Sequence, residues 1–123
     1  MAGTKNSLVF EKVLDTLVDV SARNTSTSYA LLTLDTAIGR LKKLHKVLNN
    51  VELNTSGSSS LKPVRVLSGV DLVSQEEIGK AISALIDFFA SPLGAEKESF
   101  LVEFKGYLGK EYLIKIQNMG VNI

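Results

Sequence analysis

Hydrophobic residues recur at three- and four-residue steps through most of the chain, which is the pattern of helices with one buried face. In residues 7–23 this spacing places the apolar residues on one side and polar residues, Thr16 among them, on the other. Residues 29–49 repeat the pattern and predict a second, longer helix. Leu31 and Leu32 widen its apolar surface near the start, so we expect that end to be covered on more than one side.

The second half of the chain carries clearer boundary signals. Ser74-Gln-Glu-Glu is a capping box that opens a helix, with Gly79 on its outward face. A turn at residues 91–94 ends that helix, and another follows over residues 95–108. The apolar stripe changes phase after Gly109, so we predict a break there and a separate short helix over residues 110–119. Gly120 and Val121 should close this last helix in a Schellman-type cap.

A short extended ribbon is predicted between the two halves. Residues 51–53 and 64–67 read as extended segments, and Pro63 keeps the chain before the second segment out of helix. Between them, residues 54–60 consist of small polar residues, which offer nothing to bury. The two extended segments are therefore expected to pair as a two-stranded ribbon supported by the helices.

These elements predict a mainly α fold of four to five helices, arranged as two antiparallel helical hairpins with a minor two-stranded ribbon. We interpret residues 1–123 as one domain, the size at which a single core becomes stable without metals or disulfides. Within it we expect a flexible N-terminus at 1–6, a first hairpin at 7–53, a flexible Ser-rich linker at 54–61, and an extended arm with a second hairpin at 62–123.

The two predicted hairpins resemble each other in sequence. Residues 10–20 align with residues 78–88 at a constant offset of 68, and after a two-residue insertion the match resumes at an offset of 70. This likeness has two interpretations: an internal duplication, or the similarity that any two amphipathic hairpins share through their periodicity. Under the duplication, the small residues Gly39 and Gly109 would allow helices to approach closely.

Composition narrows the classes of function. Hydrophobic residues make up 45% of the chain and charged residues 22%, and the net charge is +1. This balance argues against a dedicated nucleic-acid or membrane binder. The absence of cysteine excludes disulfides, thiolate metal sites and thiol nucleophiles. The N-terminus lacks the apolar core of a signal peptide, and no uninterrupted apolar run approaches ~20 residues. We expect a soluble, cytoplasmic protein.

Chemically reactive motifs are sparse. The single histidine, His45, falls within the apolar stripe of the predicted 29–49 helix, where a structural role at the edge of the core is the ordinary one. Nucleophile elbows, phosphate-binding loops and metal-ligand spacings are not present in the sequence. We therefore predict no catalytic, cofactor-binding or metal site, and a protein that is not an enzyme.

Two groups of residues are candidates for binding. A basic group near the end of the 29–49 helix has two interpretations. It is exposed to solvent at the end of the helix, where the helix dipole favours cations, or it contacts an anionic partner. Apolar residues off the main stripes of the later helices are candidates for a contact between protein chains. The basic patch comprises Arg40, Lys42, Lys43 and Lys46, and the candidate interface comprises Leu101, Val102 and Ile114.

The sequence thus favours a non-enzymatic interaction module of regulatory or adaptor type, which forms a homo-oligomer or binds a protein partner through helical surfaces. Nucleic-acid or anionic-ligand binding through the basic patch is a first alternative. Small-molecule binding in a pocket between the hairpins, lined by His45 and the tyrosines, is a second.

Overall fold

The computed structural model describes residues 5–54 and 64–123, and these form a mainly helical fold with a two-stranded antiparallel sheet, as predicted. Residues 1–4 and 55–63 lie outside this description, and with them most of the predicted flexible N-terminus and Ser-rich linker. The division into segments 7–53 and 62–123 stays a prediction. In chain order the elements are α1 (Asn6–Asn24), α2 (Thr27–Leu41), η1 (Lys46–Asn50), β1 (Val51–Leu53), β2 (Val64–Val66), η2 (Ser68–Leu72), α3 (Gln75–Ala90), η3 (Ser91–Glu96), α4 (Lys97–Leu108) and α5 (Lys110–Asn118).

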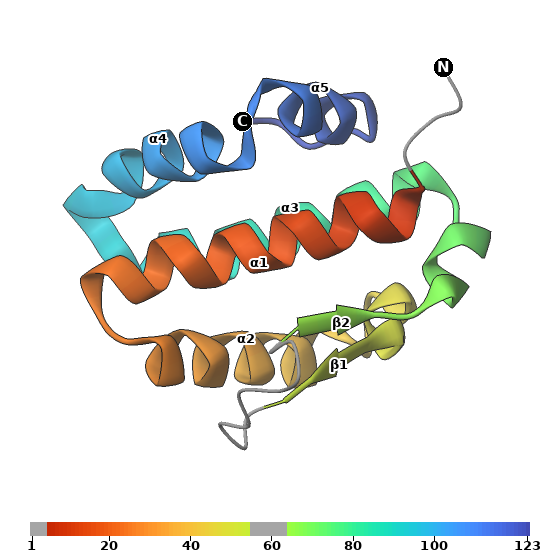
Figure 1. The fold of residues 1–123 in the computed structure, drawn as a ribbon, viewed down its shortest axis with the longest axis horizontal. Helices are drawn as coiled ribbons and strands as arrows, with labels where there is room; N and C mark the ends of the chain where they lie inside the picture. The colour runs from red at the N-terminus through yellow and green to blue at the C-terminus, as the bar shows by residue number, and fades with distance from the viewer. Residues whose placement is uncertain (1–4, 55–63) are drawn as a thin grey trace.

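Helix α1 lies at the centre of the fold. It runs across the middle of Figure 1, with α2 below it, α4 above it and α3 behind it, and it contacts all three. Its buried residues cover about 200° of the helix circumference. Thr16, predicted on the outward face, is one of them, because neighbours enclose α1 on several sides. Its hydroxyl donates to the carbonyl oxygen of Lys12 at 2.7 Å, so burial leaves this donor satisfied.

The start of α1 is held from a distant part of the chain. Asp71, in η2, accepts a hydrogen bond from the backbone N–H of Ser7 at 2.8 Å and another from its hydroxyl at 3.0 Å. A carboxylate at this place satisfies a free N–H group of the first turn and favours the positive end of the helix dipole. The contact fixes η2 against the beginning of α1.

Helix α2 ends earlier than the sequence predicted. The expected helix over residues 29–49 stops at Leu41, and the chain turns through residues 42–45 into the 3-10 helix η1. After the turn, η1 packs against α3 and η2 instead of continuing along the axis of α2, and Val47 and Leu48 are both buried there. Burial of these two side chains outweighs the helical preference of the segment.

The predicted ribbon is confirmed. Strands β1 and β2 pair antiparallel, with Val51 opposite Val66 and Leu53 opposite Val64. The pairing is extended by a hydrogen bond from the N–H of Leu67 to the carbonyl oxygen of Asn50 at 2.8 Å. The ribbon packs on α1, so the core supports this short sheet.

Glycine conformations at the later helix ends agree with the prediction. Gly109 has a φ of 92° and separates α4 from α5, as expected from the change of phase. Gly120 has a φ of 101°, and its N–H donates to the carbonyl oxygen of Gln117 at 3.0 Å. The N–H of Val121 donates to the carbonyl oxygen of Ile116 at 3.0 Å. These two bonds form the predicted Schellman cap, and Val121 is buried beneath it.

Close helix approach occurs at a different glycine from the two expected. At Gly39 and Gly109 no other atom lies within 4 Å of the position that a methyl side chain would take, so the expectation that they mediate close packing is wrong. Gly79, predicted to face outward, is buried against Met119, and a Cβ there would collide with the backbone carbonyl of Met119. The absence of a side chain at Gly79 is what allows the end of α5 to pack on α3.

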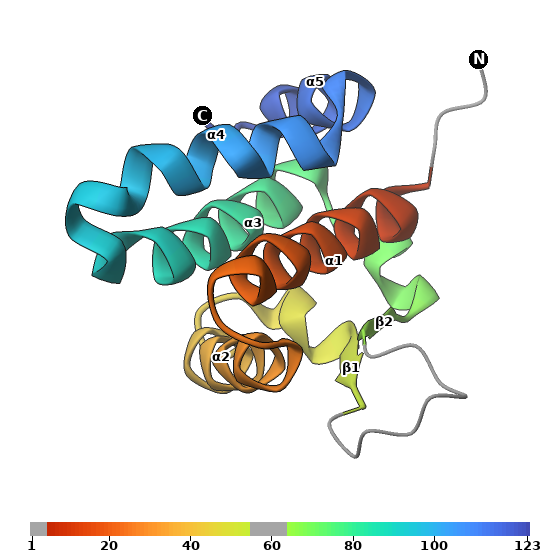
Figure 2. The same ribbon diagram turned by 60° about the vertical axis from the view of Figure 1, so that its left-hand side comes forward.

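Helices α3 and α4 reverse direction around η3. Gly94, inside η3, has a φ of 57°, which an L-residue rarely adopts. Figure 2 shows α3 and α4 as two rods joined by this turn at one end of the molecule. Within Gln75–Leu108 an 18-residue window has a mean hydropathy of 1.2, which is high enough for a membrane-crossing helix, and 44% of that window is buried inside the fold; the core helices of a soluble protein also pass this test. The expected cytoplasmic location stays a prediction.

The glycine contacts lead to a matched pair of stability predictions. Gly79→Ala forces α5 away from α3 and should lower the free energy of unfolding by about 1–3 kcal/mol. Gly39→Ala adds a methyl group in open space on a helix and should raise it by about 0.5–1 kcal/mol. Urea unfolding followed by circular dichroism measures both. Equal effects of the two substitutions would contradict the packing described at Gly79.

Candidate functional site

An apolar groove of about 450 Å³, which we call the α2–α3 groove, lies on the surface of the helical fold. It lies between the end of α1 and the first half of α2 on one side, and the end of α3, η3 and the start of α4 on the other. Its lining consists of Ser21, Asn24, Thr25, Tyr29, Leu32, Thr33, Thr36, Phe88, Phe89, Pro92, Leu93 and Phe100.

Aromatic rings build one side of the groove. Phe89 and Phe100, from α3 and α4, are nearly parallel with ring centroids 6.4 Å apart, and both are almost fully buried. Phe88 is half-buried beside them. The guanidinium of Arg40, on α2, lies 6.0 Å from the centroid of the Phe88 ring, at the outer limit of a cation–π contact. The rigid pair of buried rings gives the groove a fixed apolar base.

The α2 side of the groove is the most exposed part of its lining. Tyr29 is 57% exposed and Leu32 is 59% exposed, although Leu31 and Leu34 on the same helix are buried. The sequence predicted that this end of the helix would be covered on more than one side. That prediction is wrong for Leu32, because among the described residues no element packs over the outer face of α2. Leu93, on η3, is a third exposed apolar residue of the groove, at 39%.

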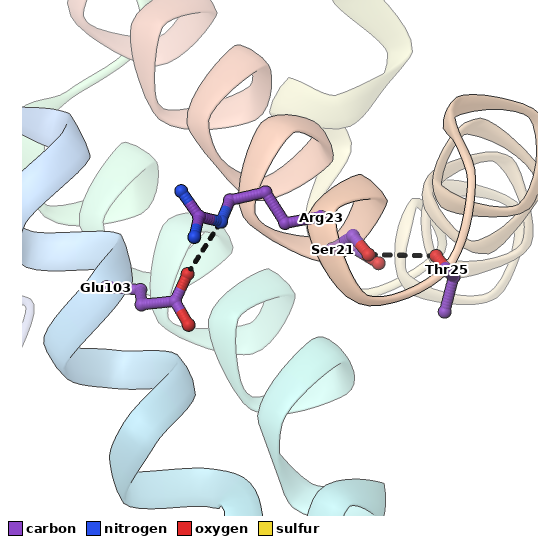
Figure 3. A network of polar contacts seen from close by, with 4 residues as sticks. All are labelled: Ser21, Arg23, Thr25 and Glu103. Atoms are coloured by element: carbon purple, nitrogen blue, oxygen red, sulfur yellow. Dashed lines mark hydrogen bonds and ion pairs between the residues drawn. The ribbon is translucent and has the colours of Figure 1, made fainter.

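Hydrogen bonds fix the turn between α1 and α2 at the end of the groove. The hydroxyl of Thr25 donates to the carbonyl oxygen of Ser21 at 2.8 Å, and the hydroxyl of Ser26 caps α2 by accepting from the N–H of Tyr29 at 3.1 Å. Figure 3 shows the first of these bonds beside the ion pair of Arg23 with Glu103, which joins α1 to α4 at 3.3 Å. The turn is thus held by local bonds on both helices.

None of the lining residues described by the structure carries a charge. Aromatic enrichment and depletion of charge are the compositional signals of the buried centre of a protein interface. Apolar side chains that stay exposed around a recess mark a surface that gains free energy when it is covered. The α2–α3 groove is therefore suited to bind an apolar surface, and its hydroxyl, amide and ring groups include no general base.

Two of the three predicted interface residues are exposed. Val102 is 64% exposed and Ile114 is 46% exposed, but they lie on different helices, α4 and α5. Leu101 was expected to stay exposed, and this is wrong, because its side chain is half-buried against the core. Their role in a contact between chains stays a prediction.

The predicted basic patch is exposed but is not one face of a helix. Arg40 lies in the last turn of α2, Lys42 and Lys43 lie in the turn that follows, and Lys46 begins η1. The predicted place of Lys42, Lys43 and Lys46 on the 29–49 helix is wrong, because α2 ends at Leu41. Binding of an anionic partner by this segment stays a prediction.

The environment of His45 also differs from the expected helical stripe. His45 precedes η1 and is half-buried in a cleft of about 370 Å³ that Lys46, Glu77 and Lys80 also line. Lys80 forms an ion pair with Glu76 at 3.4 Å, one turn earlier on α3. His45 is separate from the α2–α3 groove, so a pocket that combines it with Tyr29 is not formed. In residues 5–54 and 64–123, no three His, Asp or Glu side chains are grouped to hold a metal ion.

Comparison of the chain with models of protein families, with curated proteins and with solved structures finds no match.

Two leucines of α2, two residues apart, test whether the groove side of this helix is exposed and not part of the core. Leu32→Ala should change the free energy of unfolding by no more than about 0.5 kcal/mol, because the side chain is already exposed. Leu34→Ala removes a fully buried side chain and should cost about 2–5 kcal/mol. Chemical denaturation compares the two variants directly. A cost at Leu32 similar to that at Leu34 would mean that the outer face of α2 is covered within the monomer.

Proposed function

We propose that the protein is a non-enzymatic interaction module of regulatory or adaptor type, which docks a protein partner in the α2–α3 groove. The observation that carries this proposal is the exposure of large apolar side chains, Tyr29, Leu32 and Leu93, around a recess with no charged lining residue among those described. Single exposed leucines are ordinary on protein surfaces, but apolar residues gathered at a recess are typical of binding sites.

The chemistry of the lining supports docking of an apolar segment. Tyrosine and phenylalanine supply large contact areas with few rotatable bonds, so little side-chain entropy is lost when they are covered. The base formed by Phe89 and Phe100 is already buried and therefore does not need to rearrange. A partner side chain that enters the groove would displace water from a preformed apolar surface.

Binding of a small molecule is a second candidate, and the volume of the groove favours it. A recess of about 450 Å³ falls within the ~300–1,000 Å³ typical of ligand sites. Such sites bury most of the ligand, however, and the α2 side of this groove is open at Tyr29 and Leu32. We therefore place a protein partner first.

We also propose that the fold consists of two antiparallel helical hairpins that arose by internal duplication. The element boundaries support this proposal. An offset of 68 carries α1 onto residues 74–92, which contain α3. An offset of 70 carries Thr27, the first residue of α2, onto Lys97, the first residue of α4. The turn between α1 and α2 at residues 25–26 then corresponds to the turn between α3 and α4 at residues 91–96.

A neutral apolar dye tests the groove without knowledge of the partner. We expect Nile red to bind the wild-type chain with an increase in fluorescence, because binding in the recess moves the dye from water to an apolar surface. Leu32→Glu places a charge on the α2 side of the groove and should abolish most of the increase. Fluorescence titration measures the effect.

Leu72→Glu is the matched control. Leu72, on η2, is 91% exposed and does not line the groove, so its substitution should leave dye binding unchanged. Circular dichroism spectra should show that both variants are folded. Equal dye binding by wild type and Leu32→Glu would argue against the α2–α3 groove as the binding surface.

A further inference from the structure

A cation, Arg40, stands at one end of the uncharged α2–α3 groove. Thr36 lines the groove from α2, and Arg40 lies one turn further along the same face of that helix. Arg40 is exposed, and its guanidinium lies 6.0 Å from the centroid of the Phe88 ring, which belongs to the groove lining. The contact with Phe88 places a positive charge directly beside the apolar recess.

The guanidinium of Arg40 is available to bind an anion. Within residues 5–54 and 64–123, it forms no ion pair and donates no hydrogen bond. Contact with an aromatic ring is compatible with hydrogen bonding, because the N–H groups of a guanidinium lie in its plane.

Another arginine of the same chain shows both contacts at once. The guanidinium of Arg23 lies 5.2 Å from the centroid of the Tyr107 ring, and its Nε lies 3.3 Å from a carboxylate oxygen of Glu103. Arg40 has the same kind of ring contact, but in the described part of the chain no carboxylate accompanies it. A carboxylate from a partner would complete the arrangement at Arg40.

The charge of Arg40 is not offset by neighbouring acids. Residues 36–51 contain three lysines besides Arg40 and no aspartate or glutamate. Asp35 lies about 140° around α2 from Arg40, because each residue of a helix advances by ~100°. Asp87, on α3, lines a different recess. This end of the groove therefore attracts negative charge.

Building on the proposed function, we infer that the partner segment docked in the α2–α3 groove is amphipathic and acidic, and that its aspartate or glutamate binds Arg40. The apolar side chains of the segment cover the groove and supply most of the affinity. The carboxylate accepts two hydrogen bonds from the guanidinium, a geometry for which arginine is well suited. This ion pair sets which end of the segment lies beside Phe88.

Selection from a phage-displayed library of random 12-residue peptides tests the inference on the full chain. Such peptides are long enough, because the helix from Tyr29 to Arg40 spans only about 16 Å. We expect the peptides selected by the wild type to combine leucine or aromatic residues with an aspartate or glutamate. A synthetic copy of the most enriched peptide should lose binding to Leu32→Glu, as measured by fluorescence anisotropy.

Two charge reversals test the role of Arg40. Arg40→Glu should raise the dissociation constant of the selected peptide by about tenfold or more, because the ion pair is replaced by repulsion. Lys43→Glu is the matched control: Lys43 is exposed, does not line the groove, and its substitution changes the net charge equally. It should change the constant by less than about threefold. A peptide with lysine in place of its acidic residue should bind Arg40→Glu more tightly than wild type, a rescue that a misfolded variant cannot give.

The outcomes separate this inference from the proposed function. Selected peptides without acidic residues, a library that yields no groove-dependent peptide, equal effects of Arg40→Glu and Lys43→Glu, or a failed rescue would each overturn the acidic segment. If Nile red binding still depends on Leu32 in that case, the groove remains a binding surface for an uncharged partner. If dye binding is also insensitive to Leu32, the proposed function fails as well. Arg40-dependent binding of dodecanoate by a chain that selects no peptide would replace the segment by a small amphipathic acid.

Discussion

The enclosure of α1 is the constraint on which the rest of the structure depends. This one helix contacts α2, α3, α4, α5, η2 and β2, so each of these elements is placed by its fit to α1. A helix with buried residues over more than half of its circumference needs neighbours on several sides. The polar groups of α1 are accommodated within this enclosure. The Thr16 hydroxyl is bonded inside the helix, and Asp71 binds its first turn.

Enclosing α1 leaves α2 covered on one side only. The face of α2 with Ala30, Leu34 and Ala37 packs inward, while its opposite face borders the groove. In a chain of this size there are not enough elements to cover the amphipathic helices all round. Among the described residues, the groove is the place where no further element packs on α2, and its lining is uncharged.

Local signals in the sequence predicted local structure well. The N-cap at Ser74, the break at Gly109 and the cap at Gly120 each depend on a few neighbouring residues, and each was found. The pairing of the two extended segments was also predicted, because both contain apolar residues and a short polar stretch connects them in the sequence.

Features that depend on the tertiary arrangement were not predicted. Periodicity continued the second helix to residue 49, but burial of Val47 and Leu48 ended it at Leu41. Gly79 was predicted on the outward face of its helix, because a helical wheel does not show that the end of α5 packs against this position. The groove was missed for the same reason. The sequence did show that Leu32 adds apolar surface to the helix, and this was the available signal of the groove. The residue pattern does not show whether another element covers such a residue.

The contact between Gly79 and Met119 has a consequence for how α5 is held. Gly79 and the Met119 carbonyl that packs on it are far apart in sequence, and Met119 and Val121 are buried. Helix α5 also contacts α1 and α4, so three earlier helices together form the surface on which it docks. Loss of any one of these helices removes part of that surface, so the stability of α5 is coupled to that of the whole helical core.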